Sequence, residues 1–93
     1  MNALTKLWTE HQAAKFPSGL GGTEIEGIDL ALLDADVAGC IVTSLAIGGR
    51  LDALQQNTLR KCRRDALKVI PKLRGDVRTY FERLERITSI ALG

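Results

Sequence analysis

The side chains of this chain that could do imidazole or thiol chemistry are one histidine, His11, and two cysteines, Cys40 and Cys62. A histidine can act as an acid–base group or as a metal ligand near neutral pH. However, no cysteine lies at metal-ligand spacing from His11, and no nucleophile signature accompanies it. His11 shares a helical face with Leu4 and Trp8, which favours a histidine at the boundary of the core.

The two cysteines fall within apolar helical patterns. We interpret Cys40 and Cys62 as reduced, buried thiols, which indicates a cytoplasmic protein. The alternative is a disulfide that joins their two helices in an oxidising compartment, and it requires the two side chains to lie close together.

Acidic residues are densest between positions 24 and 36. Carboxylates suit Ca²⁺ or Mg²⁺, but their spacing here does not match the donor ladder of an EF-hand, and capping and solvation explain them. The glycine-rich run 18–22 lacks the lysine and the preceding strand of a phosphate-binding loop. We therefore expect no metal, no cofactor and no enzymatic activity. The acids are Glu24, Glu26, Asp29, Asp34 and Asp36.

Charge is distributed unevenly along the chain. Residues 1–49 hold two basic and six acidic residues, a net charge of −4, whereas residues 50–93 hold eleven and five, a net charge of +6. Arg60, Lys61, Arg64 and Lys68 project from the polar side of one amphipathic pattern. This basic face could bind an anionic partner such as nucleic acid, although no helix-turn-helix or zinc-finger signature is present.

The elements that must position these residues are helices. Apolar periodicity predicts a single all-α domain over residues 1–93, a small bundle of about four helices. We expect Asn2, Asp34 and Asp76 to cap three of them. Within the glycine-rich loop, the run 23–30 is the one alternative candidate for a strand. The expected helices cover 3–15, 35–47, 51–70 and 76–91, and the loop covers 17–33.

The segment 35–47 has no charge after Asp36, and Gly48 can end it in a left-handed conformation. We therefore expect a hydrophobic central helix that its neighbours cover. Glycine inside a helix costs about 1 kcal/mol relative to alanine, so Gly39 suggests a close approach by another helix or by a second subunit.

The last two expected helices, 51–70 and 76–91, are separated by about five residues that begin with Pro71, which ends the first of them. Such a short connection predicts an antiparallel helical hairpin. Tyr80 is expected to bury its ring and to leave its hydroxyl at the edge of the core.

These patterns favour a protein-interaction, regulatory or adaptor module over an enzyme. A chain of 93 residues has few elements with which to cover a helix as apolar as 35–47, so we expect a homodimer. No run approaches the ~20 apolar residues that span a bilayer, and no secretory signal precedes the first helix. We expect no membrane as the partner. Nucleic acid is the alternative partner and is not the favoured one. The expected interface residues are Gly39, Leu67, Ile90 and Leu92.

Overall fold

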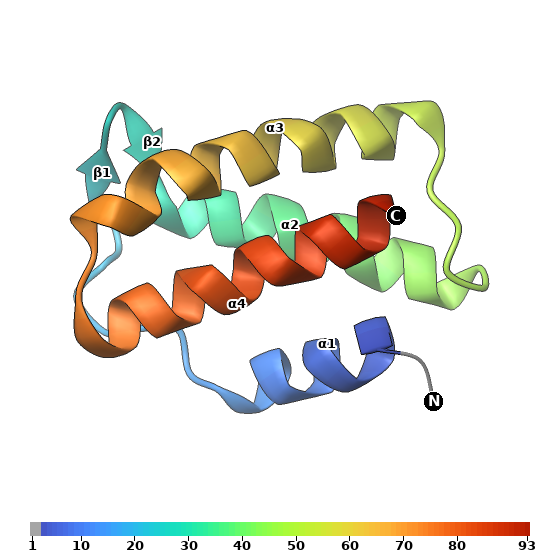
Figure 1. Cartoon of the computed structure of the whole chain (residues 1–93), viewed down its shortest axis with the longest axis horizontal. Coiled ribbons are helices and arrows are strands. Elements are labelled where there is room, and N and C mark those ends of the chain that lie inside the picture. Colours follow the sequence, from blue (N-terminus) through green and yellow to red (C-terminus); the bar gives the residue numbers. More distant parts are fainter. Residues whose placement is uncertain (1–2) are drawn as a thin grey trace.

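The computed structural model describes residues 3–93 and forms a four-helix bundle with one small hairpin (Figure 1). The expected all-α bundle is confirmed. The cap assigned to Asn2 lies outside the described residues. The elements are α1 (Ala3–Ala13), β1 (Glu24–Ile25), β2 (Ile28–Asp29), α2 (Leu30–Ala46), α3 (Ala53–Val69), the 3₁₀ turn η1 (Ile70–Lys72) and α4 (Gly75–Leu92).

The glycine-rich segment contains a minimal antiparallel hairpin of β1 and β2. Its two turn residues, Glu26 and Gly27, have φ angles of 55° and 74°, the left-handed conformation that a tight two-residue hairpin turn requires. The hairpin leads directly into α2, so this helix begins at Leu30 and not at residue 35. The loop expected over 17–33 is therefore shorter than the sequence predicts.

The cap of α2 is Asp29, whose carboxylate accepts a hydrogen bond from the backbone N–H of Leu32 at 3.1 Å. The assignment of Asp34 as the cap is wrong, because Asp34 lies in the second turn of the helix. At the other end, Gly48 has a φ of 86° and α2 stops before it, as the sequence predicts.

The C-terminal hairpin consists of α3 and α4, which lie side by side and run in opposite directions (Figure 1). Asp52 and Gln55 form a reciprocal capping box at the start of α3. Pro71 lies in η1, where its missing N–H breaks no α-helical ladder. The cap assigned to Asp76 is also wrong, since α4 begins at Gly75 and Asp76 lies in its first turn.

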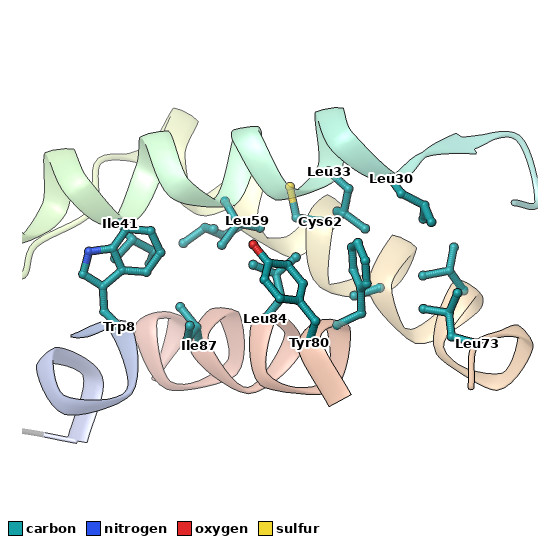
Figure 2. Packing of buried hydrophobic residues seen from close by; sticks show 14 of the residues in the cluster. Trp8, Leu30, Leu33, Ile41, Leu59, Cys62, Leu73, Tyr80, Leu84 and Ile87 are labelled. Atoms are coloured by element: carbon teal, nitrogen blue, oxygen red, sulfur yellow. The ribbon is translucent and has the colours of Figure 1, made fainter. Parts of the chain in front are cut away.

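The helix at the centre of the bundle is α4, which packs against α1, α2 and α3. Its buried residues meet those of α2 and α3 in one core, with Trp8 of α1 closing one end (Figure 2). The helix α2 contributes one side only. Its buried hydrophobic residues are Leu30, Leu33, Val37 and Ile41.

Candidate functional site

Four polar side chains from three helices form a connected cluster inside the bundle: His11 of α1, Asp34 of α2, and Tyr80 and Arg83 of α4. The Tyr80 hydroxyl donates to Asp34 Oδ1 at 2.8 Å, and His11 Nε2 lies 3.3 Å from the same oxygen. Arg83 Nε donates to His11 Nδ1 at 2.9 Å. His11 is only 4% exposed, so the cluster satisfies an imidazole that the fold buries.

The hydrogen bonds of His11 match one tautomer of its ring. Arginine has only donors, so Nδ1 of the ring must accept from Arg83, and the proton of the neutral imidazole is on Nε2. Nε2 then donates to the Asp34 carboxylate. Because both ring nitrogens are engaged within the protein, His11 presents no free nitrogen to a substrate or a metal. Its geometry is that of a residue which positions Arg83.

Aromatic rings surround the cluster. The ring centroids of His11 and Tyr80 are 4.4 Å apart, and Phe16 meets Tyr80 edge-on at 5.6 Å. Burial and then the hydrogen bond to Asp34 raise the pKa of the Tyr80 hydroxyl far above its usual value, so it remains a donor. Figure 2 shows this hydroxyl pointing from α4 toward α2. The ring of Tyr80 is buried, as expected, and its hydroxyl contacts a carboxylate whose side chain is 22% exposed.

Sequence reasoning assigned His11 to the core boundary but found none of its partners. Asp34 looked like a cap because the start of α2 was placed too late. Once α2 begins at Leu30, Asp34 falls one turn later, beside the buried stripe of Val37. Two signals in the sequence could have indicated the cluster. One is a polar residue at the edge of that stripe, and the other is a histidine on the apolar stripe of α1.

A second notable surface is the outward face of α2, opposite Val37 and Ile41. At 100° per residue, six positions without a charge occupy this face, and Asp36 lies at its edge. Leu32 is 57% exposed and Val42 is 52% exposed. The expectation of a covered central helix therefore fails on this side within one chain. The outward face consists of Leu32, Ala35, Gly39, Val42, Thr43 and Ala46.

Gly39 lies in the middle of this outward face and is exposed. A Cβ built on Gly39 would meet no atom within 4 Å, so no other helix of the same chain approaches it. Of the two close approaches that the sequence suggested, the one within the chain is excluded among residues 3–93. Approach by a second subunit stays a prediction.

The other expected interface residues lie elsewhere. Leu67 of α3 and Ile90 of α4 are 46% and 37% exposed and border a shallow hollow of about 430 Å³, together with charged residues of α4. Leu92 is half-buried and packs against the core. Leu67 and Ile90 thus form a surface separate from that of Gly39, and it is interrupted by Glu82, Glu85 and Arg86.

The expected basic face is exposed along α3. Lys61 is engaged by Asp65 at 3.0 Å, which raises the pKa of the Lys61 amine through a hydrogen bond and through charge. Arg60 donates to the side chains of Asn57 and Gln56, both neutral. Within residues 3–93, Arg64 and Lys68 make no ion pair, so both cations face solvent.

Both cysteines are free thiols and do not form a disulfide. Burial, and then the charge of Asp36, raise the pKa of Cys62 from 9.0 to about 11, and the same causes raise that of Cys40. Such thiols are poor nucleophiles at neutral pH. Across the described chain, no three His, Cys, Asp or Glu side chains gather closely enough to hold a metal ion.

Comparisons with protein-family models, with curated proteins and with solved structures found no match to this chain. Among the described helices, none combines the length and the apolar character needed to cross a membrane.

Proposed function

We propose that this protein is a non-catalytic interaction module, an adaptor or regulator, that works as a homodimer joined through the outward face of α2. The observation that carries the proposal is the apolar character of a solvent-exposed helix face. An apolar helix face is normally buried, yet α2 leaves Leu32 and Val42 more than half exposed.

The small residues of this face suit contact between two copies of the same helix. The side chains in the middle of this face are small, at Ala35, Gly39 and Ala46, so a second backbone can approach closely. Leu32 and Val42 supply apolar contacts on either side. A stable interface buries about 800 Å² per partner. One helix face does not provide this area alone, so we expect Ile47 and Leu54, which are 50% and 75% exposed, to take part.

The buried cluster supports a non-catalytic role. The one histidine has both nitrogens occupied, and burial keeps the thiol of Cys62 protonated at neutral pH. Two free thiols are typical of a reducing compartment, and on this ground we propose a cytoplasmic location.

The test is the mass in solution, measured by light scattering on a sizing column over a dilution series. Val42→Glu puts a charge on the outward face of α2, whereas Leu67→Glu does so on the α3–α4 surface at a side chain of similar exposure. We expect the wild type and Leu67→Glu to be dimers and Val42→Glu to be a folded monomer. A monomeric wild type, or dissociation by Leu67→Glu alone, would contradict the proposal.

A second candidate function is nucleic-acid binding. Arg60, Arg63 and Arg64 border one hollow of about 430 Å³ beside Leu92, and none of the three makes an ion pair within residues 3–93. Lys68, further along α3, extends the basic face. Fluorescence anisotropy with labelled single- and double-stranded oligonucleotides tests it. Binding that weakens steeply with salt, and that Arg60→Gln and Arg64→Gln reduce, would favour this function.

A further inference from the structure

Beside the polar cluster lies a hollow of about 440 Å³ between the end of α1 and the first turns of α4. Phe16, Pro17 and the Tyr80 ring form its apolar wall. Lys15, Arg83 and Asp76 are its charged residues, so the lining has a net charge of +1. Ser18 and Thr79 add hydroxyl groups. The hollow therefore combines an apolar wall with a small excess of positive charge.

Arg83 is held in this hollow by groups behind it. Its Nε donates to His11 Nδ1 at 2.9 Å, and its guanidinium carbon lies 5.5 Å from the centroid of the Tyr80 ring. His11 is in turn fixed by Asp34, which also accepts from Tyr80. These contacts restrict the side chain before any ligand arrives, which lowers the entropy lost on binding.

The front of the same guanidinium is unused. Within residues 3–93, no group accepts a hydrogen bond from its two terminal nitrogens, and Arg83 forms no ion pair. Two terminal N–H₂ groups in a plane match the two oxygens of a carboxylate.

From this geometry we propose that the hollow binds a small carboxylate with an aromatic or apolar body. Arg83 takes the carboxylate, Lys15 adds a second positive charge, and the body lies against Phe16, Pro17 and the Tyr80 ring. The net charge of +1 favours a singly charged carboxylate over a doubly charged phosphate. Asp76 opposes a second negative charge in the same space.

His11 and Asp34 act in this site as positioning residues, and they do not touch the ligand. The inference is independent of the proposed dimer, because the hollow lies between α1 and α4 and shares no residue with the outward face of α2. Val42→Glu should therefore bind the same ligands as the wild type.

The test is an NMR titration of the ¹⁵N-labelled full chain with benzoate, with benzyl alcohol and phenyl phosphate as comparison probes. We expect saturable shifts with benzoate at residues 14–18 and 76–83, weaker binding of phenyl phosphate, and no saturable shifts with benzyl alcohol. Loss of a charge-assisted contact in Arg83→Gln should weaken benzoate binding at least about tenfold. Lys15→Gln, which leaves the buried cluster intact, should weaken it less.

Arg78→Gln is the matched control, since Arg78 lies on the same helix but pairs with Glu82 at 3.3 Å and does not line the hollow. It should leave benzoate binding unchanged. The absence of saturable shifts with benzoate, equal shifts with benzyl alcohol, tighter binding of phenyl phosphate, or an equal loss in Arg78→Gln would overturn the proposal.

Discussion

Two regions of this bundle reverse the usual arrangement of apolar side chains inside and polar side chains outside. The cluster of His11, Asp34, Tyr80 and Arg83 is polar and lies largely inside, whereas the outward face of α2 is apolar and lies outside. In the cluster the buried donors have acceptors, so these polar groups are satisfied by hydrogen bonds within the chain. On α2, no group within residues 3–93 covers the exposed side chains of Leu32 and Val42.

The polar cluster and the outward face of α2 have different roles in the molecule. Hydrogen bonds are directional, so a satisfied buried cluster fixes how α1, α2 and α4 are placed relative to one another. Apolar contact is not directional, so an uncovered face specifies only that something apolar should cover it. Geometry is therefore decided within one chain, and in our proposal a second copy of the chain covers the outward face of α2.

The strongest test of this comparison removes Asp34, the acceptor that Tyr80 and His11 share. Asp34→Ala leaves the Tyr80 hydroxyl and His11 Nε2 without their acceptor and should lower the free energy of unfolding by about 2–4 kcal/mol. Urea unfolding measures it. Asp36→Ala removes an exposed carboxylate from the same helix and should stay within about 0.5 kcal/mol of the wild type. Equal effects of the two variants would mean that the cluster does not stabilise the fold.

A buried ionisable group outside the cluster provides a second comparison, and Cys62 is that group. Its pKa is raised from 9.0 to about 11 on folding, so the folded state holds the proton more tightly than the unfolded state. The stabilisation is complete below pH 9 and is lost as pH rises toward 11, by at most about 2–3 kcal/mol.

Chemical unfolding at several pH values between 9 and 11 tests this prediction. The free energy of unfolding should fall less steeply in Cys62→Ala than in the wild type. Tyr80 titrates in both proteins and so cancels in the comparison. Parallel curves would show that the burial of Cys62 has no electrostatic consequence.

The smallest expected effect concerns Gly39 on the outward face. Since a Cβ there meets no atom within 4 Å, Gly39→Ala should raise the stability of the monomer by about 0.5–1 kcal/mol. The measurement is thermal unfolding in the Val42→Glu background, which is designed to remove the proposed self-association. Destabilisation in that background would mean that another part of the same chain packs over Gly39.

The sequence by itself determined the helical class, because apolar periodicity and residues that end helices are local signals. Gly48 ends α2 through a left-handed residue, and Pro71 ends α3 because proline lacks the N–H that the ladder needs. The start of α2 was missed, since Asp29 and Asp34 are equally good caps by residue type and only the hairpin before Leu30 selects Asp29.

Only the tertiary structure decided which residues meet. His11 and Arg83 are 72 positions apart, and Tyr80 and Asp34 are 46 apart, so no spacing rule connects them. Local pattern shows that α2 is apolar but not which of its faces the chain covers. That depends on how many neighbours reach it, and α4, not α2, takes the central position. The cluster and the open face both follow from this packing, because it brings α1 and α4 to Asp34 of α2 and, among residues 3–93, leaves no helix over Gly39.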